Sequence, residues 1–180
     1  MKRTAVDQPV AFVEIPKGSR NKYEFDPRFG RVILDRTLWS SVVYPCDYGF
    51  FLDTLGPDGD PVDALVLVSA PTFSGCLIPC DPIGVLHMID EAGDDPKVLC
   101  VPHSDPVWSR VRALTDIRPS LLDEIAHFFD VYKDLEAGKH VTVSGWEGAD
   151  EARTIHKVGH DLWLEQSGSN LAERRAPGPF

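Results

Sequence analysis

Alternating polar and apolar positions near the start of the chain predict β-strands. Val10–Ile15 is rich in β-prone residues, and in residues 22–25 two charged side chains alternate with two aromatic ones. Successive side chains point to opposite faces of a strand, so this alternation is typical of a half-buried strand. A turn containing Pro and Gly at residues 27–30 leads into the β-prone residues 31–36. The two segments predict a β-hairpin.

Polar side chains in this part of the chain have two interpretations. The hairpin would carry Lys22, Glu24 and Arg36 on its polar face, as part of a site or only as a sheet face exposed to water. Residues 44–50 combine two tyrosines with a Pro and a Gly, which indicates an ordered loop that holds the Tyr48 phenol in a fixed place. A tyrosine buried in the core is the alternative.

Apolar runs later in the chain predict further strands. Residues 64–68 form a continuous apolar run, which is typical of a buried strand. Residues 84–89 and 97–101 are β-prone and are separated by an acidic connection, so they predict a second hairpin. Residues 141–143 predict one more short strand.

The last third of the chain has helical periodicity. Apolar residues recur there at three- and four-residue spacing, with Ser120 and Asp123 as a capping pair at the start and Gly138 at the end. Tyr132 and Lys133 lie near the C-terminal end, where the helix dipole favours a cation. Tyr132 fits a core aromatic equally well.

A second helix is predicted over residues 149–164. His156 and His160 are four residues apart, a spacing that places two side chains on one face of a helix, where they can chelate a metal. No third ligand is evident in the sequence. We expect both histidines to be surface or interface residues.

These elements predict a mostly β (α+β) fold with two helices near the C-terminus. Short strands, irregular loops and few crossover helices favour a closed or nearly closed barrel. A chain of 180 residues fits one domain, which we assign to residues 1–165. Residues 166–180 are rich in Ser, Gly and Pro and are expected to form a disordered tail.

The composition narrows the classes of partner. With 28 acidic and 18 basic residues, the formal net charge of −10 disfavours nucleic acid and anionic membranes but suits cation binding. No apolar run reaches the length of a signal sequence or a membrane span, so we expect a cytoplasmic protein. The four cysteines lack the paired spacing of a zinc site and are expected to be reduced core residues: Cys46, Cys76, Cys80 and Cys100.

The segment from Asp58 to Asp63, Asp-Gly-Asp-Pro-Val-Asp, places three carboxylates within six residues. Gly59 permits a positive φ, and Pro61 biases the residue before it toward an extended conformation, so the turn holds its side chains on a rigid frame. Clustered carboxylates trap protons or bind a hard cation, and oxygen ligands suit Mg²⁺, Mn²⁺ or Ca²⁺. The segment predicts a metal-binding loop.

Residues 58–63 also resemble two other structures, a polar turn and an EF-hand loop. A polar turn before a strand has the same residue types for purely local reasons, and that interpretation stays open. An EF-hand requires Gly at the sixth loop position and Glu at the twelfth, whereas this chain has Asp63 and Ser69 there. An EF-hand is excluded.

A second acidic connection lies between residues 89 and 97. It carries four carboxylates, including Asp90 and Asp95, and Lys97 follows two residues after the last of them. Acidic surface turns are common, but two acidic loops at strand ends in one small domain favour a shared site.

Taken together, these motifs closely resemble the soluble family I inorganic pyrophosphatases of the bacterial type. The most specific match is Asp58 to Asp63 followed by an apolar strand, which is similar to the family pattern D-(S/G)-D-P-x-D. The resemblance covers residues 10–147 in the right order. Other matching motifs are Glu14-Ile15-Pro16, Lys22-Tyr23-Glu24, Asp35-Arg36, Tyr44 to Gly49, Asp90-Glu91, Asp94-Asp95 with Lys97, and Tyr132-Lys133-Asp134-Leu135.

The resemblance implies a five-stranded OB-like closed barrel, a homohexamer, and hydrolysis of pyrophosphate to two orthophosphates with Mg²⁺, for which Mn²⁺ can substitute. It implies general-base catalysis by Asp60. The implied metal ligands are Asp58, Asp63, Asp90 and Asp95, with Glu14 and Glu24 as supports of the outer metal positions. The implied phosphate-binding residues are Lys22, Arg36, Tyr48, Lys97, Tyr132 and Lys133.

Two rival functions remain at this stage. One is a two-metal phosphoesterase that acts on another small phosphate compound, which the same carboxylates would serve. The other is a non-catalytic OB-type module that binds a cation and holds an oligonucleotide. The excess of acidic residues and the lack of a strand face with basic and aromatic side chains disfavour oligonucleotide binding.

Overall fold

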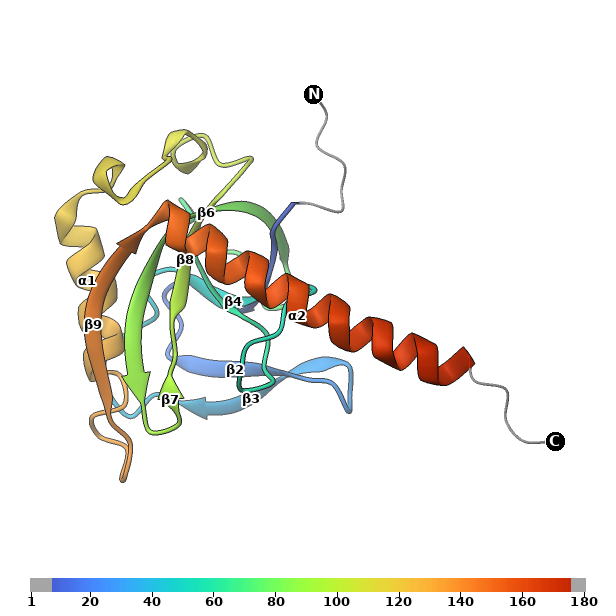
Figure 1. Ribbon diagram of the computed structural model, residues 1–180. Helices are drawn as coiled ribbons and strands as arrows, with labels where there is room; N and C mark the ends of the chain where they lie inside the picture. The colour runs from blue at the N-terminus through green and yellow to red at the C-terminus, as the bar shows by residue number, and fades with distance from the viewer. Residues whose placement is uncertain (1–7, 176–180) are drawn as a thin grey trace.

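Five strands close into a ring in the computed structural model, which describes residues 8–175 (Figure 1). Around the ring they pair in the order β1, β4, β5, β8 and β6, and β6 pairs back with β1. β5 and β8 are parallel, whereas the other pairs are antiparallel. Their bounds are β1 (Val10–Ile15), β4 (Asp47–Phe51), β5 (Asp63–Val66), β6 (Leu77–Asp90) and β8 (Lys97–Pro102). The predicted closed, five-stranded barrel is confirmed.

Strand β6 is long enough to pair with four other strands of one sheet. Its first half pairs with β1 and β8, and its second half also carries β9 (Val141–Gly148) and the short β7 (Gly93–Asp94). Gly49 in β4 lies so close to β1 that a Cβ atom there would sit 1.9 Å from the carbonyl oxygen of Phe12. Only glycine permits the two strands to pair at that point.

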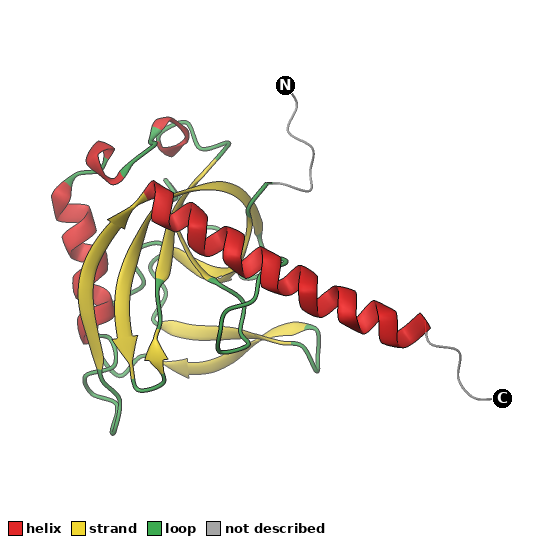
Figure 2. Cartoon of the chain, in the orientation of Figure 1, coloured by secondary structure: helices red, strands yellow, loops and turns green. Residues whose placement is uncertain are grey.

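The predicted hairpin is present as β2 (Asn21–Asp26) and β3 (Arg31–Thr37), a separate two-stranded sheet beside the barrel (Figure 2). The ring of Phe25 packs against that of Phe12 at 5.4 Å between centroids. The Phe25 backbone N–H also donates to the Glu14 carboxylate at 2.6 Å. These contacts join the hairpin to β1.

The apolar run that begins in β5 is buried because both faces of that strand are covered. Leu65 and Leu67 belong to the cluster that α1 covers, whereas Ala64, Val66 and Val68 belong to the cluster that includes Ala152 of α2. Side chains alternate between the faces of a strand, so an uninterrupted apolar run requires two cores.

Helix α1 (Pro119–Val131) differs from its prediction at both ends. It begins with Pro119 at its first turn after Arg118 as N-cap, and no side chain caps it, so the predicted Ser120 and Asp123 capping pair is wrong. Tyr132 is the C-cap, and the following residues form turns up to Gly138 at φ +76°. Leu135, predicted within the helical stripe, is exposed. Two 3₁₀ helices, η1 (Trp108–Arg110) and η2 (Leu114–Asp116), precede α1.

Helix α2 (Ala149–Arg175) crosses the outside of the barrel and extends beyond it (Figure 1). It is longer than predicted and enters residues 166–180, the predicted tail, of which 176–180 lie outside the described residues. The domain limit at residue 165 stays a prediction. Within residues 8–175, no helix is both long and apolar enough to cross a membrane.

The four cysteines are free, as predicted. Cys46, Cys80 and Cys100 are buried, and Cys76 is half-buried at the edge of the second core cluster.

The two histidines of α2 are half-buried, and both contact residues of the barrel side rather than standing free in solvent. The ring of His156 meets the edge of Phe51 at 4.8 Å between centroids, and His160 Nδ1 lies 2.8 Å from the carbonyl oxygen of Asp53. Burial lowers the pKa of His156 to about 4, and the neighbouring His160 adds to this shift.

We predict that His156 makes the fold sensitive to acid. Because its folded-state pKa lies below the ordinary 6.5, its contribution to stability is complete above pH 6.5 and is lost as the pH falls toward 4. The difference in melting temperature between the wild type and His156→Leu should therefore shift in favour of the variant between pH 7.5 and pH 5. The exposed His127→Leu serves as the control. Melting temperatures of wild type and His156→Leu that fall in parallel between pH 7.5 and pH 5 would contradict the prediction.

Candidate active site

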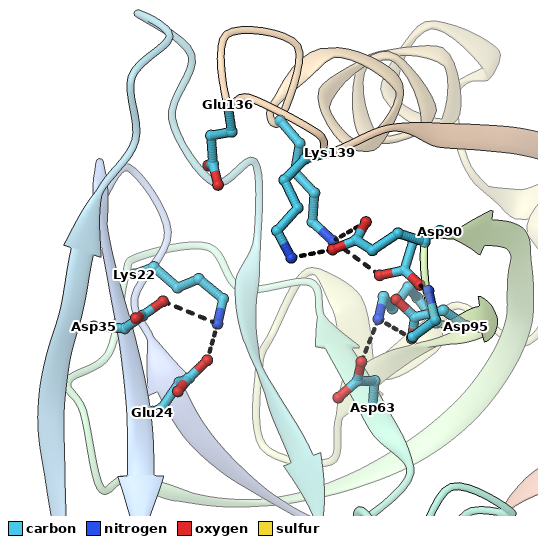
Figure 3. A network of polar contacts seen from close by, with 12 residues as sticks. Lys22, Glu24, Asp35, Asp63, Asp90, Asp95, Glu136 and Lys139 are labelled. Atoms are coloured by element: carbon cyan, nitrogen blue, oxygen red, sulfur yellow. Dashed lines mark hydrogen bonds and ion pairs between the residues drawn. The ribbon is translucent and has the colours of Figure 1, made fainter.

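Two parallel strands begin at the same edge of the barrel and bring opposite charges together there. Asp63 is the first residue of β5 and Lys97 the first of β8, and the register pairs the next residues, Ala64 with Val98. Lys97 Nζ contacts carboxylate oxygens of both Asp63 and Asp95 (Figure 3). The arrangement follows from parallel pairing, which places the starts of neighbouring strands side by side.

Lys97 is a buried cation at the centre of this group, with only 3% of its side chain exposed. Burial lowers the pKa of Lys97, but the charges of Asp63 and Asp95 outweigh this effect, and the net shift is upward. Burial raises the pKa of Asp95 despite the opposing charge of Lys97. The ammonium thus stays protonated because two carboxylates surround it.

Tyr48 of β4 completes this group from the neighbouring strand. Its hydroxyl donates a 2.8 Å hydrogen bond to Asp63 Oδ2. Lys97 Nζ also lies 5.8 Å from the centre of the Tyr48 ring. The phenol predicted to be held in a fixed place is therefore bound to a predicted metal ligand.

A second ion-pair group joins the end of β6 to the turn after α1. Lys133 Nζ lies 2.9 Å from Asp90 Oδ2 and 3.5 Å from Glu91, and Glu91 also contacts Lys139. Burial raises the pKa of Asp90, but hydrogen bonds from Lys133 and from the backbone N–H of Ala92 outweigh it, and the net shift is downward. Asp90 is held ionised.

A third group lies on the hairpin, opposite the first two groups in Figure 3. Lys22 contacts Glu24 and lies 3.5 Å from Asp35. Arg36 contacts Asp35, and its Nε donates to Glu136 at 3.0 Å. The hairpin thus presents Lys22 and Arg36, each already paired with carboxylates.

Glu14 lies between the hairpin and the barrel. Burial raises its pKa to about 7, the hydrogen bond from Phe25 opposes this shift, and the charge of Asp63 adds to it. The charge of Lys22 lowers the pKa of Glu14, and the charge of Glu24 raises it. Glu14, predicted as a support of the outer metal positions, is therefore electrostatically coupled to both sides of the site.

The β4–β5 loop, residues 52–62, carries the other two predicted acidic residues. Asp58 and Asp60 are exposed, and Asp58 Oδ1 accepts a 3.1 Å hydrogen bond from the Asp60 backbone N–H. Gly59 between them has φ +93°, the left-handed conformation that the sequence predicted glycine to supply. This loop is a tight turn whose carboxylates face solvent rather than the lysines.

Tyr132 is a core residue as well as a neighbour of the site. It is buried in the cluster beneath α1, and its ring stacks on that of Phe128 at 5.3 Å between centroids. Burial raises its pKa. Lys133 Nζ lies 5.5 Å from the centre of the Tyr132 ring.

Four residues without a predicted role also lie among these charges: Asp35, Glu91, Glu136 and Lys139. Glu136 and Lys139 lie in the turns after α1 and contact Arg36 and Glu91, while Asp35 contacts Lys22. Asp35 directly precedes Arg36 in a matching motif, which could have indicated it. The Arg36 to Glu136 contact spans 100 residues of sequence and has no local pattern.

The residues fit a hard divalent cation. Among the described residues, no three His, Cys, Asp or Glu side chains are already gathered as metal ligands. Asp63 and Asp95 nevertheless converge on one cationic nitrogen, and all predicted donors are carboxylates. Carboxylate oxygens are the ligands that Mg²⁺ and Mn²⁺ prefer.

Comparisons with known proteins match this arrangement to one family. A sequence model of the family described as inorganic pyrophosphatase matches residues 11–164. The chain is 54% identical to an inorganic pyrophosphatase of Methanosarcina acetivorans over 86% of this chain and 92% of the relative. It is also 54% identical to one of Streptomyces coelicolor, over 87% and 96%.

Solved structures of inorganic pyrophosphatases superpose on this chain. The inorganic pyrophosphatase of Helicobacter pylori superposes with a TM-score of 0.85 at 40% identity, over 88% of this chain and 94% of that one. That of Thermus thermophilus superposes with a TM-score of 0.85 at 39% identity, over 89% and 93%. The resemblance predicted from the motifs is confirmed: the chain belongs to the inorganic pyrophosphatase family and is therefore an enzyme.

Proposed function

We propose that this enzyme hydrolyses inorganic pyrophosphate to two orthophosphates with Mg²⁺ as its cofactor and Mn²⁺ as a substitute. The observation that supports this most directly is the convergence of Asp63 and Asp95 on the buried Lys97 Nζ at one edge of the barrel. A polyanion held by divalent cations requires carboxylates and ammonium groups at one place. We further propose a cytoplasmic location.

The proposed metal ligands are carboxylates from separate elements. Asp63 starts β5, Asp90 ends β6, Asp95 precedes β8 and Asp58 lies in the β4–β5 loop. Glu14 and Glu24 would support the outer positions. When bound, Mg²⁺ supplies positive charge to phosphate oxygens and makes water more acidic. The carboxylates would hold it where the pyrophosphate binds.

Asp60 is the proposed general base. It shares one tight turn with Asp58, and its own carbonyl oxygen accepts a 2.6 Å hydrogen bond from the backbone N–H of Gly56. This turn would aim the Asp60 carboxylate at the attacking water, from which it accepts a proton. Proton transfer requires such fixed geometry, because base and water must lie within hydrogen-bond reach.

Basic and phenolic side chains around the site are the proposed phosphate ligands. They stabilise the charge that grows on the departing phosphate, which is mainly an electrostatic task in phosphoryl transfer. In the structure the basic members already bind carboxylates, so phosphate oxygens would take over the same donors. Pro96 removes one backbone donor beside them. The proposed set is Lys22, Arg36, Tyr48, Lys97, Tyr132 and Lys133.

A homohexamer is the proposed assembly. Support comes from two exposed apolar side chains on one face of α2, Val158 and Leu162, which are four residues apart. Contiguous apolar surface on a helix is typical of protein interfaces.

The activity itself provides the first test. With millimolar Mg²⁺ the protein should release phosphate from pyrophosphate and leave p-nitrophenyl phosphate nearly intact, whereas chelation by EDTA should abolish the release. Adding back Mg²⁺ or Mn²⁺ should restore it. Faster release from p-nitrophenyl phosphate would identify a phosphoesterase instead.

We predict that Mg²⁺ stabilises the fold, because its binding offsets repulsion among the carboxylates. A ligand present at 100 times its Kd stabilises by about 2.7 kcal/mol, which for a protein of this size raises the melting temperature by roughly 5–10 °C. Differential scanning fluorimetry with NaCl at equal ionic strength as the control measures this. An unchanged melting temperature would argue against a metal site.

Two substitutions separate the base from the metal ligand. Asp60→Asn should keep Mg²⁺ binding and lower kcat by about 10²-fold or more, the usual loss when a general base is removed. Asp63→Ala should lose both activity and Mg²⁺ binding, and should also destabilise the fold because Lys97 stays buried with fewer partners. The exposed Asp130→Asn is the control. Normal turnover by Asp60→Asn would remove Asp60 from this role.

A further inference from the structure

Helix α2 lies directly against the β4–β5 loop that carries Asp58 and Asp60. The backbone N–H of Leu55 donates a 2.9 Å hydrogen bond to the carbonyl oxygen of Gly159 in the middle of α2. One residue further along the helix, His160 Nδ1 lies 2.8 Å from the carbonyl oxygen of Asp53. The helix therefore holds the first part of the loop at two backbone positions.

The loop needs this support at Asp53. Asp53 has φ +56°, and it is the one residue other than glycine with a positive φ among the described residues. Such a conformation is costly for a residue with a Cβ atom and persists when its surroundings stabilise it. His160 Nδ1 contacts the carbonyl oxygen of this same residue, Asp53.

Gly159 is where the helix comes closest to the loop. A Cβ atom there would lie 2.6 Å from Val62 Cγ2, 3.3 Å from the carbonyl oxygen of Leu55 and 3.4 Å from Thr54 Cβ. Glycine is unfavourable inside a helix, but at this position the absence of a Cβ atom is what allows the helix to approach Val62 so closely. Val62 is buried and β-branched, and it lies between Asp60 and Asp63 in the sequence.

Hydrogen bonds within the β4–β5 loop connect the residues that α2 holds to Asp60 and Val62. Leu55, held by Gly159, is followed by Gly56, whose backbone N–H donates to the carbonyl oxygen of Asp60 at 2.6 Å. On the other side of the loop, the buried Thr54 hydroxyl accepts from the backbone N–H of Val62 at 3.1 Å. Asp60 and Val62 are thus hydrogen-bonded to residues 56 and 54, which flank Leu55, the residue that α2 holds.

We propose that Gly159 and His160 are positioning residues for the reaction, which set the place of Asp60 through the backbone of the β4–β5 loop. The proposal rests on the proposed role of Asp60 as general base. The phosphate ligands come from β2, β3, β4, β8 and the turn after α1, so moving this loop leaves them in place and displaces Asp60 together with the proposed metal ligand Asp58, an effect that saturating Mg²⁺ offsets in the assay. A displaced loop should therefore lower kcat much more than it changes KM.

The main test compares two glycines of the same helix. Gly159→Ala places a methyl group against Val62, whereas at Gly168 a Cβ atom has no neighbour within 4 Å. Gly159→Ala should lower kcat for pyrophosphate by about 10- to 100-fold, in line with the cost of small misplacements, with KM within about twofold of the wild type. Gly168→Ala should match the wild type in both constants.

Substitutions of His160 give an independent readout. His160→Leu removes the Nδ1 donor and should lower kcat, whereas His160→Asn places an amide N–H near the same position and should recover most of it. Circular dichroism and melting temperatures above the assay temperature show that each variant is folded. A wild-type kcat for both Gly159→Ala and His160→Leu would overturn the proposal, as would equal changes in kcat and KM.

A double substitution distinguishes failure of this proposal from failure of the proposed function. If Gly159 acts through Asp60, Gly159→Ala should cost less in an Asp60→Asn background than in the wild type. Full additivity, with the kcat of Asp60→Asn strongly reduced but measurable, would overturn the positioning role and leave Asp60 as the base. A fully active Asp60→Asn would overturn the general-base assignment itself.

Discussion

The structure depends on neutralising a set of carboxylates that the fold forces together at one edge of a barrel. Asp63 and Asp95 would repel each other there, and the buried Lys97 ammonium between them is the group that offsets the repulsion. The buried Lys97 ammonium has little water to solvate it, so it interacts strongly with these half-buried carboxylates and is costly to leave without a partner. The same requirement for positive charge makes this edge suited to a divalent cation and to a phosphate compound that arrives with it.

The parts around this edge have different mechanical roles. The closed ring has no free strand edges between its five members, so it fixes β5 and β8 and the charges at their starts. The β2–β3 hairpin is a separate sheet, joined by aromatic contacts, by Glu14 and by the Arg36 to Glu136 contact. The β4–β5 loop is held from outside by α2. A rigid barrel thus carries the central charges, while two peripheral elements complete the site.

Local patterns predicted the elements whose two faces differ, and failed where tertiary contacts decided an end. The alternation in residues 22–25 identified β2 because the aromatic side chains of the hairpin pack against the barrel, whereas its charged side chains lie on the other face. Helix α1 ends at Val131 although apolar spacing continues to Leu135, and in the turns that follow Lys133 contacts Asp90. His156 and His160 gave no local indication that they face Phe51 and Asp53.

The sequence alone determined most of the strands and indicated which residue types the candidate site contains, because residue type and period are local properties. Clustered carboxylates at Asp58 to Asp63 and again near Asp95 favoured cation binding, whatever the path of the chain between them. Only the tertiary structure decided which charges meet: that Lys97 lies between Asp63 and Asp95, that Glu136 reaches Arg36, and that α2 supports the β4–β5 loop. These contacts depend on strand register and on where a helix crosses the barrel, and no local period encodes either.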